Sequence, residues 1–449
     1  WANFPAVSVA WIFSDEPFLS GISDWLTFGK VKFSYGKNGK QFSDNYLRYN
    51  MYTLGYNGMG GYAGNVSNST YNGTTAVVPD FSQLADNNLS WEESKQWDLG
   101  IELELFNKRI FATADIYNRK TDALLFGVAF PDYTGFNQVQ SNVAGIMNYG
   151  FELSFDAYLF RRGNNFQIEI QPGITHNNNM VTKLPNNDRD YINSAYSYGY
   201  TVGKPGPVYY GLNYLGPIDK LSDLPVNPYT GLPLDPTKGG VWGTAVPGYP
   251  LWEDVNGNYV VSDAADEDTQ LIDKNANPKI QGFFNFNISY KQWRLRVNNE
   301  FVFGRDIYDQ VSASVLNRYD YGSWDTKASL DLSNYSIWTG EGSGGYYPSL
   351  LATVPGSASR YGYRGSSMYW ESGNYWKIRD ITLSYNFDQP WMKKIGFSRL
   401  YVYGTVYNVW QWQKSKTVTD ASAVDSRGYT YGDGYPQARK FVLGLNLQF

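Results

Sequence analysis

The sequence contains no cysteine and a single histidine, His176, among its 449 residues. Without cysteine it has no means of forming a disulfide scaffold or a thiolate metal site. One histidine leaves little basis for histidine-dependent catalysis or a zinc centre. No apolar stretch approaches the ~20 residues that a membrane-spanning helix needs. There is also no basic block, and the formal net charge of −5 is mild, so we expect no nucleic-acid partner.

The first residues lack the features of a chain start. Trp1 stands within a strand-like pattern, and no basic segment of the kind that opens a secretory signal precedes it. We therefore expect the natural chain to begin upstream of Trp1.

What the sequence has in abundance is period-two alternation of apolar and polar residues. In the last strand, Phe441, Leu443, Leu445, Leu447 and Phe449 share one face, whereas the other face is mostly polar. The same pattern occurs at 96–105, 149–157, 166–171, 284–291, 293–303 and 380–387. Such alternation predicts β-strands with one wet and one dry face. Several of these runs reach about ten residues, the length of a tilted membrane strand.

The connections between the predicted strands differ greatly in length. Short ones fall at 107–108, 161–165 and 291–292, and long ones at about 36–95, 177–277, 304–374 and 411–437. If successive strands reverse direction, every short turn lies on one side and every long loop on the other. Residues 177–277 must then contain zero or two further crossings. This predicts an all-β, antiparallel transmembrane barrel with short periplasmic turns and long extracellular loops. The dry face would meet lipid, and Phe449 would join the aromatic girdle at the periplasmic rim.

Several stretches, in this order, resemble the SusC/RagA family of TonB-dependent outer-membrane transporters. They are "SYGKNG" (34–39), "LSWEESKQWDLGIELELFNKRI" (89–110), "IYNRKTDALL" (116–125), "NVAGIMNYGFELSF" (142–155), "YWKIRDITLSYNF" (375–387) and "YPQARKFVLGLNLQF" (435–449). The resemblance implies that residues 1–449 form about eleven strands, the C-terminal half of a 22-stranded barrel. It also implies that the plug and TonB box of such a transporter are absent from this sequence.

The resemblance implies a function as well. It is the TonB-dependent import of a nutrient, an oligosaccharide or a peptide, across the bacterial outer membrane, without enzymatic chemistry. The implied partners are a SusD-like surface lipoprotein, the TonB complex acting through the missing N-terminal part, and outer-membrane lipid; a dimer of transporter–lipoprotein pairs is a further arrangement. Two alternatives stay open: a passive porin or adhesin barrel, and a soluble β-rich carbohydrate-binding protein.

Three small motifs suggest sites and also have plain explanations. Asp254, Asn256 and Asn258 have calcium-loop spacing, but Tyr259 and Ala265 stand where an EF-hand loop has Gly and Glu. We expect an acidic turn there, with a cation site as the alternative. The sequons at Asn65, Asn68 and Asn72 are expected to be chance matches in an Asn- and Ser-rich loop. We expect His176 to be solvated.

Two larger sets of residues complete the candidates. We expect the wet-face carboxylates to line the lumen and to contact a plug rather than to act as an acid–base pair: Asp98, Glu102, Glu104, Asp115, Glu152, Asp156, Glu169 and Glu300. The loop aromatics could stack on a ligand or anchor the loops: Tyr49, Tyr52, Tyr56, Trp242, Trp252, Tyr346, Tyr347 and Trp370. We assign no catalytic, cofactor-binding or metal-binding residue, and the sequence does not identify the substrate or its contacts.

Overall fold

The structure is a computed structural model. It describes residues 2–41, 46–54, 70–71, 74–75, 77–79, 84–162, 165–193, 198–234, 246–261, 268–317, 331–350, 366–387, 396–432 and 435–448. Phe449, the three sequon asparagines, Tyr56, Trp242 and Ala265 lie outside these ranges, and the predictions made for them are not addressed by the structure.

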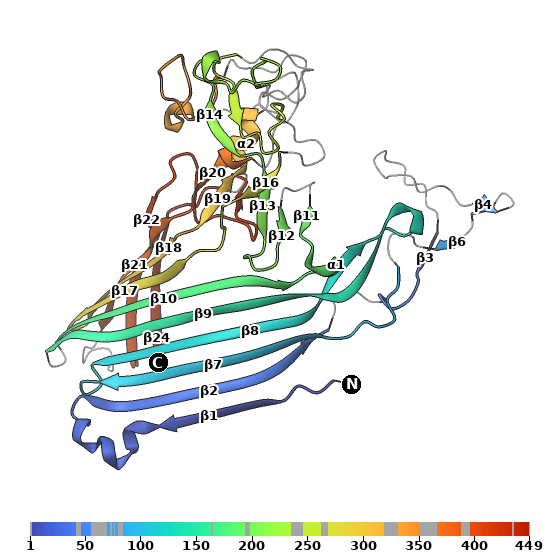
Figure 1. The fold of residues 1–449 in the computed structure, drawn as a ribbon. Coiled ribbons are helices and arrows are strands. Elements are labelled where there is room, and N and C mark those ends of the chain that lie inside the picture. Colours follow the sequence, from blue (N-terminus) through green and yellow to red (C-terminus); the bar gives the residue numbers. More distant parts are fainter. Residues whose placement is uncertain are drawn as a thin grey trace.

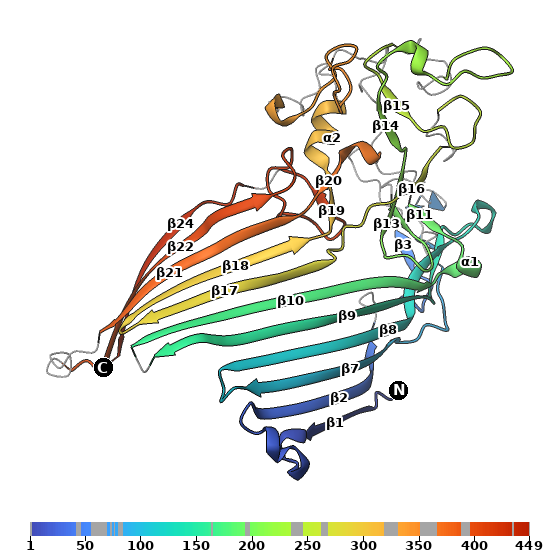
Figure 2. The same cartoon turned by 60° about the vertical axis from the view of Figure 1, so that its left-hand side comes forward.

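One antiparallel sheet of eleven strands dominates the fold (Figure 1). In sheet order its strands are β1 (Ala6–Ile12), β2 (Leu26–Lys40), β7 (Glu92–Leu105), β8 (Ile110–Ala129), β9 (Gln138–Arg162), β10 (Phe166–Lys183), β17 (Ile280–Tyr290), β18 (Trp293–Phe303), β21 (Tyr375–Phe387), β22 (Arg399–Gln413) and β24 (Lys440–Gln448). Sheet order follows chain order, and the sheet curves about its long axis (Figure 2). This confirms the predicted all-β architecture of about eleven antiparallel strands.

The strand register keeps the two faces distinct. Phe33 lies opposite Leu99, and Leu99 lies opposite Ile116, so apolar side chains form a continuous row across three strands. Three residues along, Lys30 lies opposite Glu102 on the other face. Because side chains alternate with period two, this register carries one apolar face and one polar face across the sheet.

The connections are also as unequal as predicted. At one end, β17 and β18 are joined by Lys291 and Gln292, and β7 and β8 by residues 106–109. Phe106, Asn107 and Lys108 adopt left-handed backbone conformations in that tight turn. At the other end, residues 41–91, 184–279, 304–374 and 414–439 connect the strands; the connection between β8 and β9, also at that end, is short and contains only residues 130–137. The C-terminus lies at the short-turn end (Figure 2).

The long connections contain short elements of their own. A four-stranded sheet consists of β11 (Tyr191–Asn193), β12 (Tyr198–Tyr200), β13 (Val208–Gly211) and β16 (Gln270–Ile272); β14 (Tyr214–Pro217) pairs with β15 (Pro250–Trp252), and β19 (Asp306–Asp309) lies between β20 (Trp370–Ser372) and β23 (Tyr429–Thr430). The helices there are α1 (Pro185–Asp188) and α2 (Gln310–Asn317). None of these short strands joins the main sheet, so the described residues of the 177–277 connection contain no further crossing, one of the two predicted outcomes. In the part of the chain that is described, no helix is both long and apolar enough to cross a membrane.

Strand β9 is much longer than predicted. Alternation indicated a strand at 149–157, whereas β9 has 25 residues and its partner β8 has 20. The pairing of β8 with β9 shifts register between Thr121 and Leu125, where Ala123 has a left-handed backbone conformation. These irregularities interrupt the alternation of apolar and polar residues, and the predicted strand was therefore shorter than the observed one. The hairpin continues past the rest of the sheet to a tip at residues 130–137, where Tyr133 is 89% exposed.

Candidate functional site

The polar face of β2, β7 and β8 carries a network of ion pairs. Lys32 Nζ lies 2.9 Å from Asp115 Oδ1 and 3.4 Å from Glu102 Oε1, while Lys30 Nζ lies 3.3 Å from Glu102 Oε2. Gly100 lies between these groups: a Cβ there would stand 2.1 Å from Lys32 Cε and 2.2 Å from Asp115 Oδ1. The glycine therefore leaves the space that the Lys32–Asp115 bridge occupies.

The other predicted carboxylates are spread along the same wall. Glu104 lies 3.9 Å from Lys108 Nζ. Gln171 Nε2 donates to Glu169 Oε1 at 2.9 Å and to Asp156 Oδ2 at 3.3 Å. Asp98, Glu152 and Glu300 lie on β7, β9 and β18. The set is distributed over five strands and does not converge on one centre, which agrees with wall lining.

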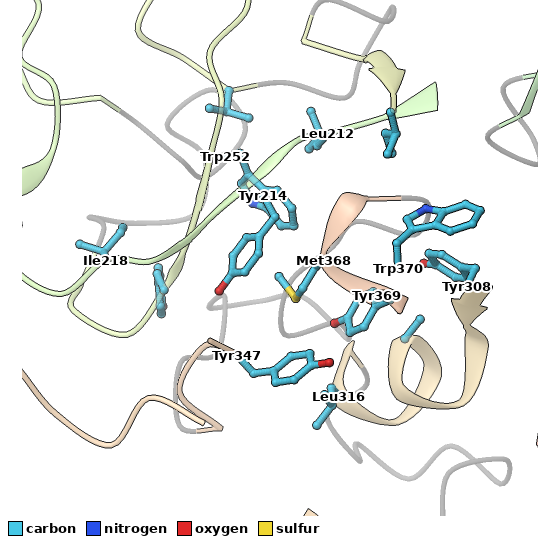
Figure 3. Packing of buried hydrophobic residues seen from close by; sticks show 14 of the residues in the cluster. Leu212, Tyr214, Ile218, Trp252, Tyr308, Leu316, Tyr347, Met368, Tyr369 and Trp370 are labelled. Carbon is cyan, nitrogen blue, oxygen red and sulfur yellow. The ribbon is translucent and has the colours of Figure 1, made fainter. Parts of the chain in front are cut away.

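Beyond the long-loop end, the connections pack into one body, here called the loop unit (the described parts of residues 184–279, 304–374 and 414–432). Its buried hydrophobic core draws side chains from the first two segments (Figure 3), and the partly buried Tyr429 of the third segment packs against it. Tyr214 and Trp252 come from the first segment, and Tyr347, Met368 and Trp370 from the second. Burying Trp252 to 1% exposure alone removes enough apolar area to stabilise the unit by about 3 kcal/mol. The long loops are thus mutually packed instead of independent.

This core resolves the role of several predicted aromatic residues. Trp252, Tyr347 and Trp370 are buried in it and act as loop anchors. Tyr346 packs edge-on against both Tyr214 and Tyr347 and stays partly exposed. Tyr49 and Tyr52 lie outside the core and are largely exposed.

A half-buried guanidinium attaches the loop unit to the sheet. Arg305 follows the last residues of β18; its Nε donates to Gly373 O at 3.3 Å and its Nη2 donates to Ala421 O. The guanidinium also lies 5.6 Å from the centre of the Tyr375 ring. Burial lowers the pKa of Arg305 from its ordinary value. One side chain therefore joins the two ends of the 304–374 connection to the 414–439 connection.

Two separate sets of hydrogen-bonded hydroxyl and carboxyl groups lie in the second segment of the loop unit. Asp309 accepts from Ser312 N at 3.0 Å and from Ser312 Oγ, and that hydroxyl lies 2.5 Å from Tyr335 OH. Tyr347 OH donates to Glu371 Oε1 at 3.1 Å. Burial raises the pKa of both carboxyl groups, and it raises the pKa of Tyr335 to about 12, so this phenol keeps its proton at neutral pH.

Two pockets lie along the sheet close to the loop unit. One has a volume of about 460 Å³ and is bounded by Thr175, Phe283, Asn285, Glu300 and Tyr375, among others. The other has a volume of about 330 Å³ and lies between β22 and the connection that follows it. Both are lined by polar and aromatic side chains, without a catalytic constellation among the residues that the structure describes.

The acidic turn at Asp254 uses its oxygens locally. Asp254 accepts from Gly257 N and from Tyr259 N, both at 2.8 Å, and Asn256 Oδ1 accepts from Asn258 N at 2.9 Å. Asn258 Oδ1 accepts from Val260 N at 2.7 Å. The described residues contain no group of three or more His, Asp or Glu side chains placed to hold a metal ion.

His176 is partly exposed, and it also has a hydrogen-bond partner that the sequence did not indicate. Its Nδ1 donates to Lys279 O over 2.5 Å, and its ring lies 5.5 Å from that of Phe151. The alternation places it at a strand end, but the carbonyl that it meets comes from a residue 103 positions away, which the sequence pattern does not indicate. The sequence pattern also does not indicate Arg305, Asp309, Glu371 and Asp420, because they lie in connections that have no hydrophobic period.

Comparisons with known proteins agree with this geometry. The model of the family described as "TonB dependent receptor-like, beta-barrel" matches residues 1–299. TonB-dependent receptor P26 of Formosa agariphila is 25% identical over 461 residues, which cover 99% of this chain and 42% of that protein. TonB-dependent receptor SusC of Bacteroides thetaiotaomicron is 26% identical over 462 residues, covering 100% of this chain and 40% of SusC. The structure of the RagAB peptide transporter superposes with a TM-score of 0.75 at 21% identity, over 99% of this chain and 43% of that one. The chain thus spans about two fifths of the length of these relatives.

Proposed function

The chain belongs to the TonB-dependent receptor-like β-barrel family, is of the SusC/RagA type and is an outer-membrane protein, and on that premise we propose that it forms part of the wall of an energised nutrient importer. Because the chain is an outer-membrane protein, the alternative of a soluble carbohydrate-binding protein is excluded. The observation that carries the proposal is the two-faced sheet. Its apolar face suits lipid, and its ion-paired polar face suits a water-containing interior.

In this proposal, residues 1–449 are the C-terminal portion of a single barrel domain. The loops at about 36–95, 177–277, 304–374 and 411–437 are extracellular. The sheet order leaves β1 and β24 with one neighbouring strand each. An unpaired strand edge in hydrocarbon costs several kcal/mol per backbone group. Polypeptide outside this sequence therefore supplies about eleven further strands, together with the plug and the TonB box.

The long-loop end has a surface that suits a lipoprotein lid. The first segment of the loop unit carries several exposed apolar side chains between residues 215 and 232, among them Leu215, Leu221, Val226, Tyr229 and Leu232. Tyr229 is 93% exposed. Exposed apolar groups of this kind mark protein interaction sites. We assign them to a SusD-like partner, with an oligosaccharide or a peptide held between the lid and the loop unit.

Energised import is tested by its dependence on the proton-motive force. Cells that make the complete transporter would be given fluorescently labelled neutral oligosaccharides and, separately, labelled oligopeptides, with and without a protonophore. The proposal predicts that uptake of one of the two panels stops when the protonophore is added or when TonB is removed. Uptake that continues unchanged would identify a passive porin instead.

A further inference from the structure

The connection between β22 and β24 folds back over the polar face of the sheet. Gln413 Nε2 donates to Val418 O at 2.5 Å, and Gln413 Oε1 accepts from Ala421 N at 3.0 Å. The strand register places Gln413 opposite Tyr375, which lies opposite Val302. Val418 and Ala421 are buried in one hydrophobic cluster with Tyr375 and Val302. The connection is thus fixed to the inner side of the wall.

The backbone of this connection is fixed at further points. Arg305 Nη2 donates to Ala421 O, as described above. Gln411, one step along the same face, donates from Nε2 to Asp420 Oδ1 at 3.0 Å. Lys414 N donates to Asn374 O at 3.0 Å. The side chains of Arg305 and of two β22 glutamines, together with this backbone hydrogen bond, therefore hold residues 414–422 in position.

The 330 Å³ pocket lies between this fixed connection and the wall. It is lined by Lys377, Gln411, Gln413, Thr419, Asp420 and Gln437, among others. Lys377 is 6% exposed although it carries a charge. The pocket therefore has a preformed polar lining, since the residues that build it are held by hydrogen bonds to one another.

Two charged groups in the pocket retain unused hydrogen-bonding capacity. Asp420 Oδ1 accepts from Gln411 Nε2, from Ser422 N at 2.8 Å and from Ser422 Oγ at 2.7 Å. Within the described part of the chain, Asp420 Oδ2 accepts no hydrogen bond, and Lys377 Nζ donates to Gln437 Oε1 alone. Burial raises the pKa of Asp420, but the bonds from Gln411 and Ser422 and the charge of Lys377 outweigh it and hold the pKa below its ordinary value. The carboxylate is therefore ionised at neutral pH.

The balance of charges defines the ligand chemistry. One carboxylate and one ammonium group offset each other, so a charged ligand gains no net attraction and disturbs the pair. A neutral group that donates to Asp420 Oδ2 and accepts from Lys377 Nζ satisfies both. We propose that this pocket is a ligand subsite for an uncharged group that carries a donor and an acceptor side by side, the chemistry shared by the vicinal hydroxyls of a sugar and the amides of a peptide. The inference rests on the proposed import function and locates one contact point for its cargo.

The test is the affinity of purified, complete transporter for two probe panels, measured by calorimetry. One panel holds neutral malto- and cello-oligosaccharides, and the other holds peptides of Ala, Ser and Asn with acetylated and amidated ends. Asp420→Asn replaces the Oδ2 acceptor by a donor, and Lys377→Met removes the ammonium group but keeps the stem. Lys416→Met is the matched control, because Lys416 is exposed on the same connection and does not line the pocket. Thr419→Trp fills the pocket from an exposed position and serves as a second route if either charge variant fails to fold.

For whichever panel binds the wild type, we expect a Kd at least about ten-fold weaker in D420N, K377M and T419W, since each loses a charge-assisted hydrogen bond or the space for the ligand. K416M should bind as the wild type does. Unchanged affinity in D420N, K377M and T419W would overturn the subsite while leaving import intact. Binding of neither panel to the wild type would contradict both the subsite and the import of a neutral nutrient. The panel that binds also decides between sugar and peptide.

Discussion

At the scale of single residues, the loop unit depends on polar groups that its hydrophobic core surrounds. Asp309 lies at the start of α2 and accepts from Ser312 N, as an N-cap does. Glu371 is held by Tyr347. Burial raises the pKa of both carboxyl groups, and for Glu371 the charge of Asp309 adds to the rise while the charge of Lys274 opposes it. Lys274 is itself engaged with Asp306 at 3.5 Å.

A raised carboxyl pKa makes the loop unit sensitive to pH. An acid whose pKa is higher in the folded state supplies stability that is fully present below its ordinary pKa and is lost as pH rises through the raised value. The loop unit should therefore resist limited proteolysis better at pH 5 than at pH 8. Glu371→Gln, which mimics the protonated form, should reduce this difference. Glu341→Gln is the control, because Glu341 is exposed and pairs with Lys220. An E371Q protein with the full wild-type pH dependence would contradict the assignment.

The roles of several residues in the loop unit could not be predicted from the sequence. Arg305, Asp309, Glu371 and Asp420 lie in connections without a hydrophobic period, so nothing in the pattern distinguished them from solvated charges. Their roles come from contacts between segments far apart in sequence, such as Arg305 with Ala421. In contrast, the sequence identified Trp252 and Tyr347 as either loop anchors or ligand contacts. Both side chains are buried in the core of the loop unit, which makes them loop anchors.

At the scale of elements, the strands were the most predictable part of the chain. The alternation in the last strand placed Leu443, Leu445 and Leu447 on one face, and the register of β24 with β22 pairs Leu445 with Val402 and Leu443 with Gly404. Tight turns at 107–108 and 291–292 were also predicted correctly. The extents of β8 and β9 were not, because bulges near Ala123 break the period that the prediction relied on.

The two faces of β24 give a direct test of which one meets lipid. Leu445→Arg would place a cation in the apolar band, at a cost of about 2–4 kcal/mol near the bilayer midplane. Asn446→Arg, on the neighbouring position and the opposite face, should be tolerated because that face is wet. The measurement is the fraction of folded, heat-modifiable barrel for each variant in detergent. Equal losses for the two variants would reverse or abolish the assignment of faces.

At the scale of the whole molecule, the protein consists of two parts, the sheet and the loop unit. The sheet supplies a wall whose apolar and polar faces are kept separate by register, and the loop unit covers its long-loop end with a buried aromatic core of its own (Figures 2 and 3). The sequence predicted the wall and the position of the loops. The packing of three loops into one body was not predicted, because loop–loop contacts leave no periodic trace in the sequence.

The central claim is that these eleven strands are part of a larger closed barrel, and a cryo-EM map of the complete natural protein in lipid nanodiscs tests it most directly. The account predicts that β1 and β24 each pair along their free edge with a strand from outside this sequence. It also predicts that the polar face surrounds a lumen containing plug density, and that residues 414–422 lie against the inside of the wall. A map in which β1 pairs with β24 to close a small barrel, with no density inside, would contradict the account and identify a small porin.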